Sequence, residues 1–238
     1  MKKISIAFVL YFLAVTNIWA TPIDQNCPQF TAYGSPDAQF APDTQFLCRK
    51  NYAVIHACSV KNPVAVMEYI TLPAITGTSK RQDDFREDPE VTPDCRSRLA
   101  DYQGGQYDRG HMSPAGNNTQ TAEIMSESFF LSNMIPQVPN NNRGIWRILE
   151  SQVRDQIKET GQGLYVISGA IFDPNHTKIG NNVGVPTRLF KIIINKQTGR
   201  VTAFLMPNAP LPVADLPKYV TTVQEVEQAT GMKFKVTQ

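Results

Sequence analysis

The stretch D-R-G-H-M-S-P-A-G-N at residues 108–117 places a histidine directly after an Arg-Gly pair, in a chain with only three histidines. Imidazole has a reference pKa of ~6.5, so neutral His111 could take a proton from water near neutral pH. That chemistry belongs to a general base held at the mouth of a cleft. Taken alone, His111 fits a turn residue satisfied by nearby backbone equally well.

A second group of polar residues belongs to the clearest helix of the sequence, which runs from the asparagines at 140–142 to Gly161. Asparagines stand where an N-cap would, and Gly161 is placed to end the helix. At about 100° per residue, Asn142, Glu150 and Arg154 lie at the border of the apolar stripe, where a helix lines a cleft. By itself this segment is more simply an amphipathic helix with an exposed Glu-Arg pair.

The remaining candidates for chemistry favour structural roles. His56 lies in an apolar strand, and His176 lies in the loop D-P-N-H-T-K. Ser168 lacks the G-x-S-x-G elbow of a nucleophilic serine. The four cysteines contain no C-x-x-C pair, so they indicate two structural disulfides with three open connectivities and no zinc site.

The elements that must position these residues can be predicted from hydrophobic patterns. Residues 52–60 and 64–72 form a predicted hairpin around a turn at 61–63, and three further strands are predicted at 164–172, 188–194 and 200–207. Short helices are predicted at 121–131 and 220–231, whereas 73–106 is a long irregular excursion. Because βαβ alternation is absent, the expected fold class is α+β, with a central antiparallel sheet, flanking helices and long loops.

The N-terminus has the form of a secretory signal. Residues 1–20 combine two lysines, a short apolar run and Ala20 at the end. We expect cleavage there, export to the periplasm or the medium, no stable membrane association afterwards, and a single domain at 21–238 whose first part, 21–48, is an extended lead. Removing Lys2 and Lys3 from the 23 basic residues leaves 21 against 21 acidic ones. Any electropositive groove must therefore be local.

Three blocks, taken together and in order, carry a family resemblance. D-R-G-H-M-S-P-A-G-N, F-L-S-N-M-I-P-Q and N-R-G-I-W-R-I-L-E-S-Q-V-R resemble the DNA/RNA non-specific endonuclease family, whose active site is a ββα-metal motif. Further blocks such as V-I-S-G-A-I-F and V-P-T-R-L-F-K-I extend the resemblance over roughly residues 50–235. The fold implied is an α+β sheet that contains this motif.

The resemblance assigns roles position by position. His111 becomes the general base and Asn142 the metal ligand, while Glu150 and Asn133 hold the waters of the metal or support the site. Arg109, Arg154 and Arg81 become phosphate contacts that assist catalysis, with Arg86 as the alternative to Arg81. The implied cofactor is Mg²⁺, or Mn²⁺ or another divalent cation.

The implied activity is hydrolysis of phosphodiester bonds in single- and double-stranded DNA and RNA, leaving 5′-phosphate and 3′-hydroxyl ends. An inhibitor protein is a further expected type of partner. One alternative is a secreted nucleic-acid-binding protein that kept the fold and lost catalysis. Another is a disulfide-stapled surface domain with no nucleic-acid role, which would show no DNA binding even at low salt.

Overall fold

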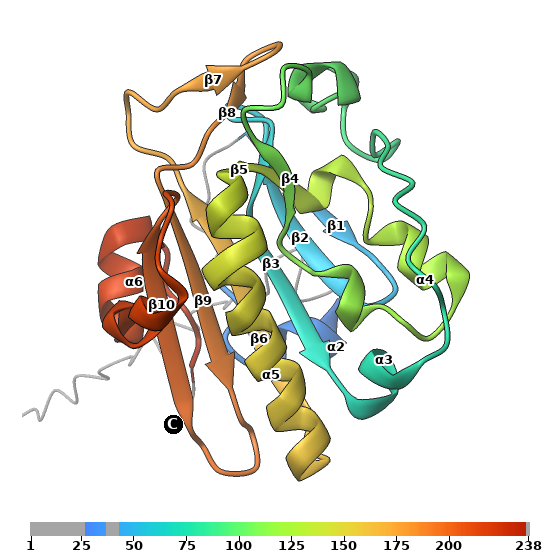
Figure 1. Cartoon of the computed structure of the whole chain (residues 1–238), viewed down its shortest axis with the longest axis vertical. Helices are drawn as coiled ribbons and strands as arrows, with labels where there is room; N and C mark the ends of the chain where they lie inside the picture. The colour runs from blue at the N-terminus through green and yellow to red at the C-terminus, as the bar shows by residue number, and fades with distance from the viewer. Residues whose placement is uncertain (1–26, 37–42, 237–238) are drawn as a thin grey trace, which may run out of the picture.

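A seven-stranded antiparallel sheet forms the scaffold of the protein in the computed structural model, which describes residues 27–36 and 43–236 (Figure 1). The predicted signal at 1–20 lies outside the described residues. In sheet order the strands are β1 (Thr44–Cys48), β2 (Tyr52–Ala57), β3 (Asn62–Ile70), β6 (Leu164–Ile171), β9 (Arg188–Ile194), β10 (Val201–Pro207) and β11 (Val220–Thr221). Two small pairs lie outside it: β4 (Asp108–His111) with β5 (Met134–Gln137), and β7 (Lys178–Ile179) with β8 (Val183–Gly184).

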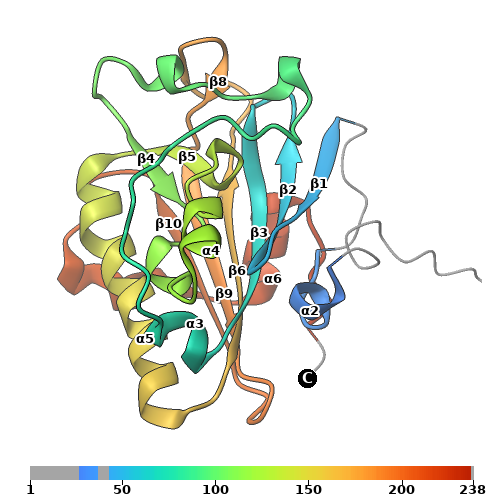
Figure 2. The same ribbon diagram turned by 90° about the vertical axis from the view of Figure 1, so that its right-hand side faces the viewer.

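Helices cover both faces of this sheet (Figures 1 and 2). One face packs against α2 (Pro28–Thr31) and α6 (Val223–Thr230), and the other against α5 (Arg147–Thr160) and the β4–β5 pair. The remaining helices are α3 (Leu72–Thr76), α4 (Ala122–Glu127), a π-helical segment (Asn141–Trp146) and short 3₁₀ turns (Pro93–Cys95, Leu99–Tyr102, Ala115–Asn117, Leu131–Asn133 and Val213–Tyr219). Because helices cover both faces, β6 is buried along its whole length, which explains its nearly continuous apolar sequence.

The predicted fold class is confirmed, and so are the main strands. The hairpin predicted at 52–60 and 64–72 is present as β2 and β3, with a bulge between Ile55 and His56. The three later strands are β6, β9 and β10, and the C-terminal helix α6 ends at Gly231, which has a left-handed φ of 72°. Glycine adopts this conformation without the steric cost that other residues bear.

Within the described residues, the lead predicted at 21–48 contains two regular elements. Thr44–Cys48 forms β1, the edge strand of the main sheet, and Pro28–Thr31 forms the short helix α2. The high content of Pro, Gln and Asp concealed this strand. Its backbone pairs with β2 over five residues, and Leu47 is buried against the sheet.

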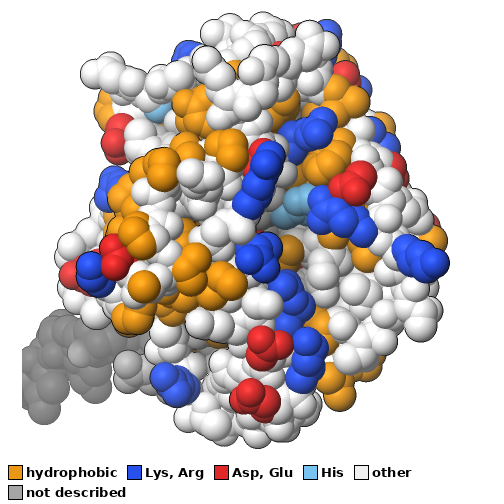
Figure 3. All heavy atoms as spheres, in the orientation of Figure 1, with side chains coloured by type: hydrophobic (Ala, Val, Ile, Leu, Met, Phe, Trp, Pro, Cys, Tyr) orange, Lys and Arg blue, Asp and Glu red, His pale blue; other side chains and the backbone are white. Residues whose placement is uncertain are grey.

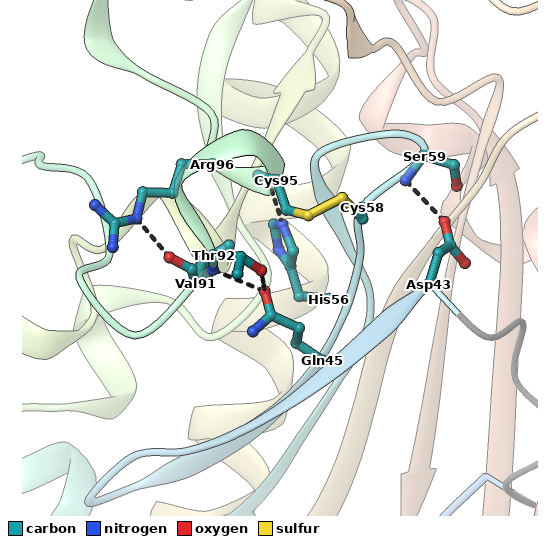
Figure 4. Close-up of a disulfide and its surroundings, with 9 residues drawn as sticks. All are labelled: Asp43, Gln45, His56, Cys58, Ser59, Val91, Thr92, Cys95 and Arg96. Atoms are coloured by element: carbon teal, nitrogen blue, oxygen red, sulfur yellow. Dashed lines mark hydrogen bonds between the residues drawn. A yellow bond between two sulfur atoms is a disulfide. The ribbon is translucent and has the colours of Figure 1, made fainter.

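Two disulfides attach segments of the N-terminal half of the chain to the main sheet. Cys27 pairs with Cys48, and Cys58 pairs with Cys95, which resolves the three open connectivities. The second bridge fastens the excursion at 73–106 to the turn after β2 (Figure 4). Beside it, the ring nitrogen Nε2 of His56 lies 3.0 Å from the Cys95 carbonyl oxygen, and Thr92 N–H donates to Gln45 Oε1 at 2.9 Å. His56 is therefore buried and structural, as predicted.

Across residues 27–36 and 43–236, none of the helices has both the length and the apolar character that a membrane span requires.

Candidate active site

His111 is the last residue of β4, which pairs with β5 in a two-stranded ribbon over the α5 face of the main sheet. This pair of strands was not predicted from the sequence, because strands of four residues are too short to show a clear alternating pattern. Gly110 makes the pairing possible, because a Cβ atom there would lie 2.0 Å from Gln137 Oε1. The two strands and helix α5 together form a ββα unit around one pocket.

Aromatic rings enclose the imidazole of His111. The ring centroids of Phe85 and Phe129 lie 5.6 Å and 5.1 Å from it, both in edge-on contact. Burial, together with the positive charges of Arg81 and Arg109, lowers the pKa of His111 to about 3. The ring is therefore neutral at physiological pH. Its Nε2 atom is buried and has no hydrogen-bond partner among the described residues.

Asn142 is oriented by Asp108, the first residue of the D-R-G-H block. Asn142 lines the pocket, and its amide Nδ2 donates to Asp108 Oδ2 at 2.9 Å, so this contact does not use the acceptor Oδ1. Arg143 donates to both oxygens of the same carboxylate, from Nε to Oδ2 at 2.8 Å and from Nη2 to Oδ1 at 2.6 Å. Burial opposes ionisation of Asp108, but these donors outweigh it and keep the Asp108 pKa below its usual value.

The predicted N-cap of the long helix was wrong. No side chain caps the start, because residues Asn141–Trp146 form a π-helical segment in which Gly144 has non-helical angles of φ −103° and ψ −111°. The buried amide of Asn141 instead accepts from Gln137 Nε2 at 2.8 Å and donates to the carbonyls of Pro207 and Ala209. The π-helical segment places Asn142 beside β4, where its side chain donates to Asp108. The predicted stop at Gly161 is confirmed by its left-handed φ of 68°.

Two turns of α5 bring Glu150 and Arg154 into the same pocket. Burial raises the pKa of Glu150, while the positive charges of Lys191 and Arg154 act in the opposite direction. The guanidinium of Arg154 donates from Nη1 to Asn117 Oδ1 at 3.3 Å. Gly116 gives it room, because a Cβ atom at that position would come within 3.3 Å of the Arg154 guanidinium carbon.

The excursion contributes Arg81 from the opposite side. Arg81 lines the pocket over the ring of Phe129, at 5.1 Å from its centroid, and pairs with the exposed Asp83 at 2.7 Å. Arg109 stacks over Phe85 at 4.2 Å. Arg86 is directed elsewhere: it donates to Asp84 Oδ2 at 2.8 Å and to Ser126 O at 2.9 Å.

Asn133 lies below the pocket and not in its wall. Its side chain is fully buried, accepts from Ser113 N–H at 2.9 Å and donates to the carbonyls of Ser113 and Ser128 at 2.8 Å each. With its amide engaged in this way, Asn133 fixes the backbone that follows His111. The geometry places it as a supporting residue.

These side chains surround a single cavity of about 710 Å³. The charged residues that line it among those described are Arg81, Arg109, Arg143, Arg147, Arg154, Asp83, Asp108 and Glu150. Positive charges therefore predominate, although the chain as a whole is nearly neutral. Figure 3 shows Lys and Arg side chains gathered around a histidine and along α5 on this face. Such a surface attracts polyanions.

The donor set fits a hydrated magnesium ion better than a metal held by a protein cage. Over the described ranges no group of three or more His, Cys, Asp or Glu side chains could hold a metal ion. Magnesium keeps several of its waters and needs few protein ligands. Asn142 and Glu150 line the pocket, and the amide oxygen of the one and the carboxylate of the other could bind the ion and its waters.

Three charged residues with contacts to the segments around the pocket were not identified from the sequence: Asp108, Glu68 and Lys191. Asp108 belongs to the D-R-G-H block, but nothing in the sequence indicated its partner. Glu68 and Lys191 carried a usable signal, because each is a charged residue inside an apolar strand run, V-A-V-M-E-Y-I and R-L-F-K-I-I-I. Charges in such runs are rarely buried without a partner.

Comparisons with known proteins agree with this geometry. The model of the DNA/RNA non-specific endonuclease family matches residues 32–237. Mitochondrial endonuclease G of Homo sapiens is 31% identical over 222 residues, which cover 87% of this chain and 73% of that protein. Nuclease C1 of Cunninghamella echinulata var. echinulata is 33% identical over 227 residues, which cover 88% of each. In the crystal structure of the EndoG/EndoGI complex, a chain superposes with a TM-score of 0.77 at 28% identity, over 90% of this chain and 91% of that one.

Proposed function

Because this chain belongs to the DNA/RNA non-specific endonuclease family and is a nuclease, we propose that it hydrolyses the phosphodiester bonds of both DNA and RNA in the pocket between β4 and α5. One observation carries the proposal. A neutral histidine, an amide oxygen, a carboxylate and several arginines, which come from separate parts of the chain, line the same cavity.

His111 acts as the general base in this proposal. Its ring is neutral over the whole physiological range because burial and neighbouring arginines lower its pKa. Since Nε2 is buried, the other ring nitrogen, Nδ1, takes the proton from the attacking water. The side chain of Asn133 bonds to the backbone N–H and carbonyl of Ser113, close to His111 in the chain. These bonds fix the direction of the His111 ring.

Asn142 would hold the metal through Oδ1, because its Nδ2 atom is engaged by Asp108. The carboxylate of Glu150 would accept hydrogen bonds from the waters of the ion. A bound Mg²⁺ would supply Lewis acidity to the scissile phosphate and neutralise charge on the departing 3′ oxygen.

Arg81, Arg109 and Arg154 bind phosphate oxygens and stabilise the negative charge that builds up during hydrolysis. Contacts of this kind read the backbone of the nucleic acid and not the base edges, so we propose little sequence preference. The same reasoning supports cleavage of single and double strands.

We further propose that the enzyme is exported. The two disulfides support this, because such bridges persist in oxidising compartments. In the EndoG/EndoGI complex it is EndoG that is inhibited, and for this chain an inhibitor that covers the arginine-lined pocket is a proposal of the same kind.

Replacing His111 with Ala tests the catalytic assignment. We expect kcat to fall by about 10²- to 10⁴-fold on both plasmid DNA and ribosomal RNA, which is the usual contribution of a general base. Folding and affinity for DNA should remain, as measured by circular dichroism and by binding in EDTA. The matched control is His56→Asn, a buried histidine outside the pocket. Parent protein that binds DNA but cleaves neither substrate with Mg²⁺ would favour the inactive binding protein.

A further inference from the structure

Glu68 on β3 and Lys191 on β9 are two charged residues buried in the main sheet beneath the pocket. Their exposed fractions are 2% and 1%. Both strands flank β6, and the register pairs Glu68 with Val166 and Lys191 with Ser168. The proposed catalytic roles assign no task to either residue, and burying a charge in a core is costly unless it is compensated.

Glu68 is connected to both walls of the pocket. Its Oε1 atom accepts from Ser113 Oγ at 2.8 Å and from Asn117 Nδ2 at 3.1 Å. Ser113 follows His111 by two residues. Asn117 in turn accepts from Arg154 Nη1, so one carboxylate oxygen reaches the histidine loop and, through one amide, the phosphate-binding arginine.

Lys191 supplies the opposite charge. Its ammonium group donates to Ser168 Oγ and lies 4.5 Å from the centroid of the Trp146 ring, at the start of α5. Burial raises the pKa of Glu68 to about 7 and also raises that of the partly exposed Glu150, and the positive charge of Lys191 acts in the opposite direction on both.

We propose that Glu68, compensated by Lys191, is a positioning residue that sets the histidine loop and Arg154 for catalysis. The carboxylate fixes the segment Ser113–Asn118, and the Asn117 amide, once fixed, presents its oxygen to Arg154. The positive charge of Lys191 favours the ionised form of this carboxylate, which burial opposes. The assignment rests on the proposed function, because Arg154 is a phosphate contact there.

A pair of substitutions at residue 68 tests the hydrogen bonds separately from the fold. Glu68→Leu keeps the volume and removes the acceptor, and we expect kcat/KM to fall by about tenfold to a hundredfold through misplaced groups. Glu68→Gln keeps an acceptor for Ser113 and Asn117 and should recover most of that loss. The matched control is Val166→Ala, opposite Glu68 in the register, which should lower Tm and leave kcat/KM within about twofold.

A second arm asks whether the effect passes through Arg154. In an Arg154→Ala background, Glu68→Leu should cost several-fold less in kcat/KM than it does in the parent, because the group being positioned is gone. Equal losses in both backgrounds, or an equal loss for Glu68→Leu and Glu68→Gln, would overturn the proposal.

A double-mutant cycle with Glu68 tests the role of Lys191. Lys191→Met should lower Tm and kcat/KM because it leaves Glu68 without its counter-charge, and the double variant Lys191→Met/Glu68→Gln should recover part of the Tm. A double variant that is no more stable than Lys191→Met would refute the pairing.

Hydrogen exchange provides a readout that does not depend on turnover. The amides of Ser113, Asn117 and Asn118 are bonded to Asn133 Oδ1, Pro114 O and Ala115 O. Their exchange should accelerate at least tenfold in Glu68→Leu relative to Glu68→Gln. Unchanged protection would overturn the positioning role. Parent protein without nuclease activity would instead refute the proposed function, and the exchange result would still decide whether Glu68 orders this segment.

Discussion

At the scale of single residues, the site depends on what its neighbours do to each group. A histidine at the surface would be half protonated near pH 6.5 and would lose its use as a base below that pH. His111 avoids this because its burial beside Phe85 and Phe129, together with two nearby arginines, lowers its pKa.

The pH dependence of cleavage follows from this environment. A lowered pKa means that His111 stays unprotonated as the pH falls from 6.5 towards about 3. We expect kcat/KM at saturating Mg²⁺ to change by less than about twofold between pH 7.5 and 6.0, where an ordinary imidazole would lose about three quarters of its activity. A fourfold fall in kcat/KM over that interval, with the fold intact by fluorescence, would contradict the assignment.

The orientation of Asn142 gives a second prediction at this scale. Asp108→Ala removes the acceptor that turns the amide, so the Mg²⁺ concentration for half-maximal rate should rise by about 10- to 100-fold, as for other outer-shell partners. Asp108→Asn keeps an acceptor and should lie between the parent and Ala. A magnesium titration of Asp108→Ala that overlays the parent's would exclude the orienting role.

At the scale of elements, the excursion at 73–106 delivers Arg81 and Phe85 to the pocket, although it contains little regular structure. The middle of the excursion is anchored by Asp88, which pairs with the buried Arg49 and accepts from Ser132. Further along the chain it is anchored by the Cys58–Cys95 bridge (Figure 4). Asp88 therefore lies between Arg81 and the disulfide in the sequence.

Removing that disulfide should separate stability from activity. The bridge closes a loop with a sequence separation of 37 residues, which corresponds to about 4 kcal/mol of stability in the chain-entropy model. We expect Cys58→Ser/Cys95→Ser to lower the free energy of unfolding by up to about that amount. Its kcat/KM below the Tm should stay within about threefold of the parent value. A large loss of kcat/KM in the folded double variant would show that the disulfide also positions Arg81.

At the scale of the whole molecule, charge is distributed unevenly. The chain is nearly balanced by composition, yet arginines from three separate segments converge on one face. Convergence of this kind concentrates the positive electrostatic field where a polyanion would bind, on the face drawn in Figure 3.

The salt dependence of cleavage tests this view. We expect kcat/KM on DNA and RNA alike to fall as KCl is raised at constant Mg²⁺, because bound counterions are released from the phosphates. Arg147→Ala, at the exposed rim of the pocket, should reduce the slope of log kcat/KM against log salt by about one on both substrates. Arg188→Ala, paired with Asp173 away from the pocket, is the control. Identical slopes for Arg147→Ala and the parent would place the nucleic acid elsewhere.

The sequence by itself determined the local structure and the order of the motifs. The strand-like runs at 52–60 and 64–72 and the later apolar runs predicted the main strands correctly, and Gly161 and Gly231 marked two helix ends. These features depend on neighbours a few residues apart, so they can be recognised in a linear sequence. The three blocks likewise pointed to the family through residue types at fixed spacings.

Only the tertiary structure decided which distant residues meet. Asp108 and Asn142 are 34 residues apart, and Glu68 and Asn117 are 49 apart, so no local period couples them. The π-helical segment, the β4–β5 pair and the cysteine pairing have the same origin, because each is stabilised by contacts with segments far away in the chain. Local patterns fix where strands and helices form, but the sheet order fixes which side chains share the pocket.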